Sequence, residues 1–395
     1  MPPARAARLS QKVLAEVCCL SYEPHLLQTG ALSSAEMGIR TGFKRVQGRI
    51  ERMFRVGMFS LREKTLYVGA LDLWIDSMRS RTRCYVSHGH ADHARPHDVV
   101  ITSVNNAKVC AHRFRRRAQK APSLFGDVQP ASVPVSYQAH RYNEPWRIGD
   151  HELTLFSAGH VLGSSQLLIR GASGRFVYTG DFKLERSYTA EAPEVKQCDT
   201  LLMECTYGRP EYVFPPRAEI AGAMVAWARK ALEDGAVPIF FAYSLGKAQE
   251  AMAILGAAGI PLAAHAAVAS MSDIYVEAGV KLPPYERYDA EYFDGARALI
   301  WPPSGRALPA AVRGKPVRTA ALTGWVIGKK NHWQRTDAGF PLSDHADFPS
   351  LLRYIELAQP RKVLLNHGSR DFVFRLKKFG IDAEYLESNA QLALF

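Results

Sequence analysis

Short apolar segments of this chain end, one after another, at a residue that can bind a metal ion or transfer a proton. They are LWI before Asp76, CYVS before His88, LFSAG before His160, FVYTG before Asp181, LLM before Glu204 and VLLN before His367. Short runs of this kind, bounded by Gly, Pro or Asp, predict β-strands. Because α/β folds gather their chemistry where strands end, we expect an α/β protein with these side chains at one edge.

The densest of these clusters is His88-Gly89-His90-Ala91-Asp92-His93, directly after a predicted strand. Burying such polar groups without partners costs several kcal/mol each, roughly, whereas a divalent cation satisfies them together. His88 and His90 point the same way if the chain leaves the strand extended, so both reach one ion, and Asp92 and His93 reach another. Imidazole-rich ligation favours zinc over magnesium, with manganese or iron as lesser alternatives. The sequence predicts a site for two metal ions.

Composition sets broader bounds. The chain has 395 residues, 47% of them hydrophobic, which allows a large core in two domains or in one domain with an insertion. A formal charge of +12 favours a polyanionic partner, although a merely basic surface explains it too. The 6 cysteines show no CxxC spacing, which favours a reducing cytoplasm, and no segment is long and apolar enough for a membrane span.

The organisation changes along the chain. Residues 1–57 carry scattered basic residues and weak periodicity, so we expect a poorly ordered N-terminal extension. From Met58 onward short strands follow one another, and between about 216 and 275 helical periodicity alternates with the strand VPIFFAYS, as in βαβ units. The last block, SDHADFPSLLRYIELAQPRKVLLNHGS, predicts a helix followed by a strand.

These motifs, in this order, resemble those of the metallo-β-lactamase fold nucleases of the β-CASP group. The likeness covers about Leu66 to Glu384. The fold's own motifs are matched by Asp76, by HGHADH (residues 88–93), by His160 in SAGHVLGS and by Asp181 in YTGDF; the β-CASP motifs are matched by Glu204 in MECTYG, His345 in LSDHAD and His367 in LLNHGS. The HxHxDH motif alone would be equally typical of lactonases, glyoxalases and sulfur-handling enzymes, but the full set is not.

The resemblance implies a metallo-β-lactamase αββα sandwich with an inserted α/β β-CASP cap domain. Its first part would span residues 58–208, the cap 209–335 and the returning part 336–395. Within the cap, FAYSLGKAQE predicts a strand, a tight turn and a helix start. Ser244, Gly246 and Lys247 there would offer backbone amides and a cation to substrate phosphate, although an ordinary helix entry explains the same residues.

The resemblance also implies roles at the site. One zinc would take His88, His90 and His160, the other Asp92, His93 and His367, with Asp181 bridging both and Asp76 orienting the histidine loop by hydrogen bonds. Two such cations hold a bridging water and lower its pKa to about 7, so hydroxide would attack the phosphodiester. His345, kept protonated by Glu204, would then protonate the leaving oxygen.

The substrate is the harder inference. FAYSLGKAQ, TYGRPEYVFP, LTGW and LSDHADFPSLL are most similar to the bacterial ligase-associated DNA exonucleases, which implies an exonuclease of single-stranded or end-containing DNA in DNA repair, with a DNA ligase and helicase as partners. The alternative is an RNA exonuclease or mRNA 3'-end processing nuclease, because His367 stands where RNA-processing members carry His. A non-catalytic binding subunit would lack metal ligands, and a small-ester hydrolase would not need Glu204 or His345.

Overall fold

The computed structural model describes residues 55–56, 58–120, 135–303, 312, 314–328 and 335–386. The chain separates into two units, Met1–Phe54 and Arg55–Phe395, and every described residue belongs to the second. The expected N-terminal extension, residues 1–57, therefore lies outside the described residues except for Arg55 and Val56. Its poor order stays a prediction.

A 7-stranded sheet opens the described part of the chain, with its strands in sequence order. Its members are β1 (Arg55–Val56), β2 (Phe59–Arg62), β3 (Thr65–Val68), β4 (Leu73–Ile75), β5 (Arg83–Tyr85), β6 (Val99–Ser103) and β7 (Ser136–His140). Pairing is antiparallel from β1 to β4 and parallel from β4 to β7. Because β4 and β5 run parallel, Asp76 and the histidine loop leave the sheet at the same edge.

The second sheet also has 7 strands, in the order β20-β19-β12-β11-β10-β9-β8. Its members are β8 (Trp146–Ile148), β9 (His151–Ser157), β10 (Ser165–Gly171), β11 (Gly174–Tyr178), β12 (Thr200–Cys205), β19 (Lys362–Gly368) and β20 (Ala383–Tyr385). Strands β8 to β11 form an antiparallel meander, and β11, β12, β19 and β20 pair parallel. Asp181, Glu204 and His367 therefore lie at the carboxyl ends of neighbouring parallel strands.

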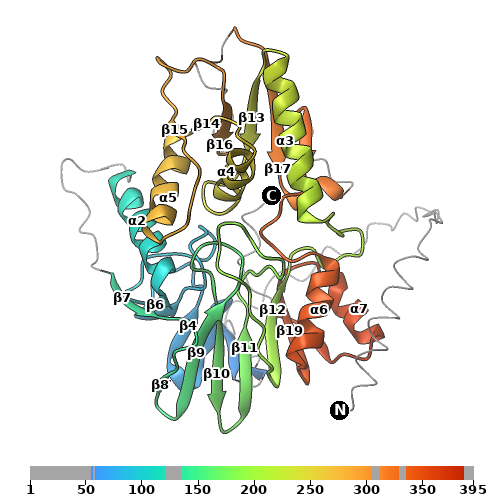
Figure 1. Cartoon of the computed structure of the whole chain (residues 1–395). Coiled ribbons are helices and arrows are strands. Elements are labelled where there is room, and N and C mark those ends of the chain that lie inside the picture. The colour runs from blue at the N-terminus through green and yellow to red at the C-terminus, as the bar shows by residue number, and fades with distance from the viewer. Residues whose placement is uncertain are drawn as a thin grey trace, which may run out of the picture. The chain divides into compact units, whose positions relative to one another are not determined.

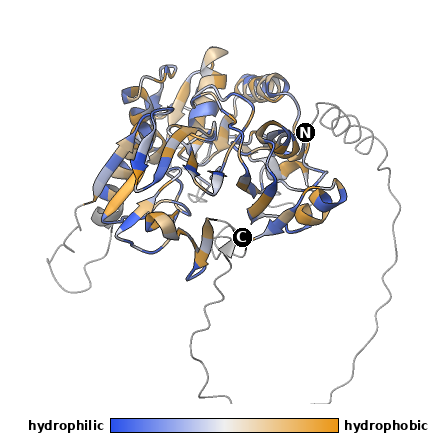
Figure 2. Cartoon of the chain, turned by 90° about the horizontal axis from the view of Figure 1, so that it is seen from below, coloured by the Kyte–Doolittle hydropathy of each residue, from blue (hydrophilic) through white to orange (hydrophobic). Residues whose placement is uncertain are grey.

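The two sheets pack on each other around one apolar core. Phe59 of the first sheet meets Phe176 of the second edge to face, with ring centroids 6.2 Å apart, and Tyr85 meets Tyr178 in the same way at 6.3 Å. Strands β10 and β12 are buried along most of their length, as expected where both faces of a sheet are covered, and Figure 2 shows hydrophobic residues on several strands. Among the described helices, none is long and apolar enough to cross a membrane.

A third sheet, with 6 parallel strands in the order β15-β14-β16-β13-β17-β18, forms the cap domain. Its strands are β13 (Val237–Phe241), β14 (Leu262–Ala264), β15 (Glu286–Arg287), β16 (Ala298–Trp301), β17 (Val317–Leu322) and β18 (Ala338–Phe340). This whole segment lies in sequence between β12 and β19, which are hydrogen-bonded neighbours (Figure 1). The cap is therefore an insertion, and its sheet continues past residue 335.

Helices cover these sheets. They are α2 (Val104–Lys120), α3 (Arg217–Glu233), α4 (Lys247–Ala257), α5 (Ala266–Glu277), α6 (Phe348–Ala358) and α7 (Asp371–Lys378), with short 3-10 helices η1 (Gly69–Leu71) and η3 (Gly324–Ile327). The apolar residues of α3 recur at helical spacing, and Ile220, Met224 and Ala228 pack with α4 and one face of the cap sheet. The predicted α/β architecture, a metallo-β-lactamase sandwich with a β-CASP cap, is confirmed.

Candidate metal centre

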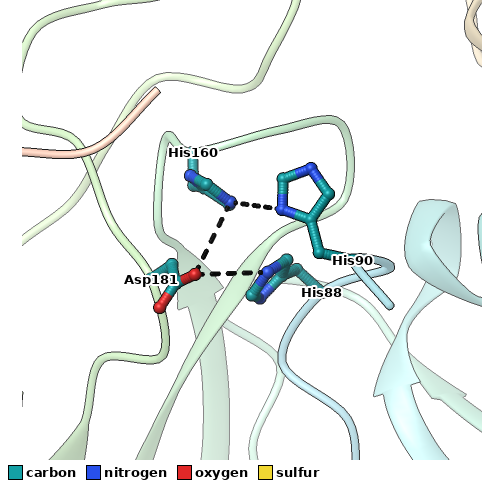
Figure 3. Close-up of side chains that lie close together, drawn as sticks. All are labelled: His88, His90, His160 and Asp181. Carbon is teal, nitrogen blue, oxygen red and sulfur yellow. Dashed lines mark hydrogen bonds and ion pairs between the residues drawn. The ribbon is translucent and has the colours of Figure 1, made fainter. Parts of the chain in front are cut away.

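Four side chains from three different loops converge on one point (Figure 3). His88 and His90 follow β5, His160 follows β9 and Asp181 follows β11, and one ligand atom from each lies within 4.8 Å of all the others. The Nε2 atom of His160 is 3.0 Å from Nδ1 of His90, and Asp181 Oδ2 is 3.5 Å from Nε2 of His88. The structure thus brings together the ligands expected for one ion, plus the expected bridging carboxylate.

The donor set fits a cation. His88 and His160 are almost fully buried, and within the described part of the chain Nε2 of His88 has no hydrogen-bond partner. Burial lowers the pKa of His90 to about 4 and holds the pKa of His88 well below its usual range, so both rings are neutral at pH 7. Neutral imidazoles beside a buried carboxylate are the ligands that zinc prefers.

Asp181 also faces the residues expected for the second ion. Its Oδ2 lies 3.4 Å from Nε2 of His93, which is 3.9 Å from Oδ2 of Asp92. The ring of His367 stacks on that of His93 with centroids 4.9 Å apart. Burial opposes protonation of His93, but the surrounding carboxylates outweigh it and raise its pKa to about 10. A cation bound there would take the place of that proton.

Asp76 lies behind the histidine loop and fixes it. Its Oδ1 accepts the Ser87 backbone N–H at 2.7 Å, while Oδ2 accepts the Ser87 hydroxyl at 2.6 Å and the Tyr178 hydroxyl at 2.7 Å. Nδ1 of His93 also lies 2.9 Å from Oδ2 of Asp76, which leaves Nε2 of His93 for the metal centre. An outer carboxylate of this kind fixes the tautomer and the orientation of a ligand ring.

Unusual backbone conformations occur at two of the candidate residues. Asp76 and His367 have φ of 44° and 47°, in the left-handed region that non-glycine residues seldom adopt. Gly368 follows with φ of 145°, and a Cβ there would lie 1.9 Å from the carbonyl oxygen of Cys205. Only glycine fits this close approach of β19 to β12, so Gly368 sets where His367 stands.

The half-buried His345 and the buried Glu204 form a pair beside the centre. Nδ1 of His345 is 3.0 Å from both carboxylate oxygens of Glu204, which also accepts the Phe182 N–H at 2.8 Å and the Thr206 hydroxyl. Burial lowers the pKa of His345, but the charge of Glu204 outweighs it and raises that pKa to about 9. The ring centroid of His345 lies 4.7 Å from that of His160. A protonated imidazole therefore stands next to the candidate metal ligands.

Leu245 of the cap domain and Asp344, in the loop between β18 and α6, also contact the candidate ligands. The carbonyl oxygen of Leu245, in the loop before α4, is 3.2 Å from Nε2 of His90. The carbonyl oxygen of Asp344 is 2.7 Å from Nδ1 of His160, and the Asp344 carboxylate pairs with the buried ammonium of Lys247. Burial alone would raise the pKa of Asp344, but the Lys247 charge holds it well below its usual range.

Comparison with known proteins places this site in a family. Residues 339–386 match the Zn-dependent metallo-hydrolase RNA specificity domain. The chain is 33% identical over 332 residues, 83% of its length, to a probable DNA ligase from Opitutus terrae, of which it covers 31%. It is 36% identical over 202 residues to the transcription termination factor FttA of a Lokiarchaeum species, covering 45% of this chain and 31% of that protein.

A eukaryotic relative extends the comparison. The chain is 34% identical over 194 residues to cleavage and polyadenylation specificity factor subunit 3 of Dictyostelium discoideum, covering 43% of this chain and 24% of that protein. The chain belongs to the β-CASP group of the metallo-β-lactamase fold. It spans about a third or less of the length of these relatives.

In this β-CASP protein the loop expected to bind phosphate is engaged internally. The Gly246 N–H donates to Oε1 of Gln249 at 2.9 Å, and Nε2 of Gln249 donates to the Ser244 carbonyl at 3.0 Å. Lys247 is 5% exposed and is paired with Asp344. The geometry is that of an ordinary helix entry, which the sequence left open, and phosphate binding by Ser244, Gly246 and Lys247 stays a prediction.

Sequence reasoning missed the β-CASP residues that support the ligands from behind. Asp344 stands next to His345 in LSDHAD, but its partner Lys247 is distant in the sequence, so no local pattern revealed the pair. The Leu245 contact uses a backbone carbonyl, which carries no residue-type signal at all. The Tyr178 hydroxyl on Asp76 was hidden for another reason, because Tyr178 is typical of a buried strand.

Proposed function

We propose that this β-CASP protein is a metal-dependent hydrolase that cleaves phosphodiester bonds, acting as a DNA exonuclease in DNA repair. The observation that carries the proposal is the position of Asp181. Its Oδ2 lies 3.5 Å from His88, 3.4 Å from His93 and 4.0 Å from His160, between the two expected ligand sets. The pair of Glu204 and His345 lies against the same centre. Two metal positions beside a proton donor suit phosphodiester cleavage.

The proposed ions are two zinc ions, with manganese as the alternative. The first would be held by His88, His90 and His160, the second by Asp92, His93 and His367, with Asp181 shared. When bound, such a pair supplies charge neutralisation for the phosphate and lowers the pKa of a water held between the ions. Of the proposed ligands, His367 is less buried than His88 and His93.

The chain's own contribution to bond cleavage would come from His345. Because Nδ1 of His345 is held by Glu204, the ring presents Nε2 to a substrate. At neutral pH the ring is protonated, since the Glu204 carboxylate raises its pKa to about 9. His345 would donate this proton to the departing sugar oxygen, a step that contributes typically about 10²–10⁴-fold to the rate.

DNA is the preferred substrate because the likeness to the probable DNA ligase runs over 83% of the chain. The alternative is an RNA exonuclease or mRNA 3'-end processing nuclease. It is supported by the RNA specificity domain matched over 339–386 and by the probable RNase of Methanocaldococcus jannaschii, 26% identical over 204 residues. The identity of one ligand residue, His367, does not distinguish RNA from DNA, because the difference lies in the 2'-hydroxyl of the sugar. The preference between the two substrates is therefore left to experiment.

The proposed compartment and partners follow from the same evidence. The described cysteines, Cys84, Cys110, Cys198 and Cys205, are buried and free, as expected in a reducing cytoplasm. Similarity to a protein named as a probable DNA ligase supports a DNA ligase as partner. A helicase is proposed from the family resemblance alone. Both partners are proposals for binding assays with the purified proteins.

The deciding experiment incubates the purified, zinc-loaded chain with end-labelled single-stranded DNA, single-stranded RNA and a lactone. Stepwise shortening of DNA that stops on chelation supports the proposal. Faster shortening of RNA favours the alternative, and hydrolysis of the lactone alone would contradict both. Loss of all cleavage in the Asp181→Ala variant, measured in parallel, excludes a contaminating nuclease.

A further inference from the structure

Tyr243 presents an aromatic ring to solvent from the loop that touches the metal ligands. The loop follows β13 and leads into α4, and the side chain of Tyr243 is 50% exposed. Two residues further on, the Leu245 carbonyl oxygen lies 3.2 Å from Nε2 of His90. An exposed aromatic ring therefore lies close in the chain to a direct contact with the metal centre.

The ring is held in place from one side. Its centroid is 5.0 Å from Nζ of Lys247, which is itself buried and paired with the buried carboxylate of Asp344. The Asp344 carbonyl oxygen in turn lies 2.7 Å from Nδ1 of His160. This succession of contacts fixes the ring relative to the ligands, and the exposed part of the ring remains open.

The polar groups of this loop and its aromatic ring differ in how open they are to a ligand. Lys247 is paired with Asp344, and the Gly246 N–H donates to Gln249, so both groups already have a partner within the protein. Among residues 242–247, Tyr243 is the most exposed. Bases of single-stranded nucleic acids stack on such faces with little regard to sequence, because every base has a π-face.

We propose that Tyr243 is a stacking platform for a nucleobase beside the bond to be cleaved. The inference rests on the proposed nuclease function and adds to it a binding site for an unpaired base. It places single-stranded ends, rather than paired duplex, in the centre, since a stacked base must first be unpaired. It adds a base contact to a loop for which phosphate binding stays a prediction.

The chain offers a matched control in Tyr292, which is 76% exposed. It belongs to the same cap domain but lies near the opposite ends of the strands. Two residues after Tyr292, the Asp294 carbonyl accepts from Nζ of Lys315 at 2.7 Å. Lys315 lies just before β17, whose first residue pairs with the first residue of β13, so Tyr292 is near the amino ends of these strands. Tyr243 instead follows the carboxyl end of β13.

The test measures binding by fluorescence anisotropy with the full, zinc-loaded chain. The probes are single-stranded DNA oligonucleotides with phosphorothioate linkages, which slow cleavage, and the same oligonucleotides with one abasic position moved along the strand. We expect Tyr243→Ala to raise the Kd of the complete oligonucleotide about 10-fold, and Tyr243→Phe and Tyr292→Ala to leave it within about twofold. One abasic position should weaken binding to the unmutated chain by a similar factor.

The double comparison decides the matter. When the abasic position is the one whose base would stack on Tyr243, Tyr243→Ala should not raise the Kd of that oligonucleotide any further. The proposal is overturned if Tyr243→Ala raises the Kd by the same factor for the complete oligonucleotide and for every abasic one. It is also overturned if Tyr243→Ala leaves the Kd of the complete oligonucleotide unchanged. Failure of the nuclease proposal is seen separately, as binding of the unmutated chain without any cleavage of phosphodiester-linked DNA or RNA.

Discussion

Nδ1 of His345 lies 3.0 Å from both carboxylate oxygens of Glu204, and this contact determines the charge of the imidazole. The two residues are far apart in the sequence but adjacent in the fold, because β12 ends beside the loop that precedes α6. Burial on its own would leave the ring neutral. The buried carboxylate reverses this and raises the pKa of His345 to about 9.

The first prediction concerns pH dependence. An acid catalyst must be protonated, so kcat/KM for DNA should hold at neutral pH and fall as pH rises through about 9, the raised pKa of His345. Glu204→Gln removes the stabilising charge while the ring keeps its other surroundings, so the alkaline limb should move to lower pH by about one unit or more. If the alkaline limb of the Glu204→Gln variant stays at the same pH, the limb reports the titration of a group other than His345.

The second prediction concerns the support that the cap gives to the metal ligands. Lys247→Met leaves the Asp344 carboxylate buried without its partner, which should destabilise the fold by about 3–5 kcal/mol. Because the Asp344 carbonyl holds His160, zinc affinity should also fall, by about 10–100-fold. Both quantities are measured, by thermal unfolding and by competition with a chelator.

Lys247→Arg keeps the charge and should restore much of the affinity. Lys362→Met removes a lysine whose Nζ is 2.7 Å from the exposed Glu384 and should change neither quantity by much. An altered visible spectrum of the cobalt-substituted Lys247→Met chain would show that ligand geometry has changed. Unchanged zinc affinity and spectrum in a folded Lys247→Met chain would refute the supporting role.

The third prediction concerns backbone at the site. Gly368→Ala places a Cβ against the Cys205 carbonyl at a φ of 145°, so the chain must shift and should lose at least about 2 kcal/mol of stability. Gly222→Ala is the control, because a Cβ at this helical glycine meets nothing within 4 Å. The control should gain up to about 1 kcal/mol. Equal unfolding midpoints in urea for both variants would contradict this account.

The fourth prediction concerns the metal itself. Elemental analysis should find about two zinc or zinc-like ions per chain, and added zinc should raise the melting temperature by mass action, equivalent to about 2.7 kcal/mol at 100-fold excess over Kd. Asp181→Asn should hold less zinc, because both ligand sets share this carboxylate. Asp289→Asn, at an exposed carboxylate, should bind as the unmutated chain does. A chain that cleaves DNA at full rate after removal of all metal would contradict the site.

Much of this arrangement could be predicted because its signals are local. The HGHADH run and the strands that end at Asp76, Asp181 and Glu204 are visible in short windows of sequence, and the structure brings these residues to one edge. The α/β fold followed from the same patterns, whereas the inserted cap was implied by the resemblance of the motifs to those of the family. Local signals sufficed to predict a site residue wherever its residue type and its place at the end of a strand are both visible within a few consecutive positions.

The remainder depends on contacts that no short window contains. The sequence offered Lys247 as a cation for phosphate, with an ordinary helix entry as the alternative, but it gave no sign that Lys247 is 5% exposed and paired with Asp344. The Leu245 carbonyl contacts His90 only because α4 begins above the histidine loop. Tertiary packing decided both outcomes, and neither is encoded by spacing along the chain.

The most direct test of the account compares two substrates in one variant. DNA has a poor leaving group, so His345→Ala should slow its cleavage by about 100 to 10,000-fold. A nitrophenyl phosphodiester has an acidic leaving group, and His345→Ala should hydrolyse it at close to the unmutated rate. His90→Ala, which removes a metal ligand, should fail on both. Equal losses on the two substrates for His345→Ala would contradict the assignment of His345 as the acid.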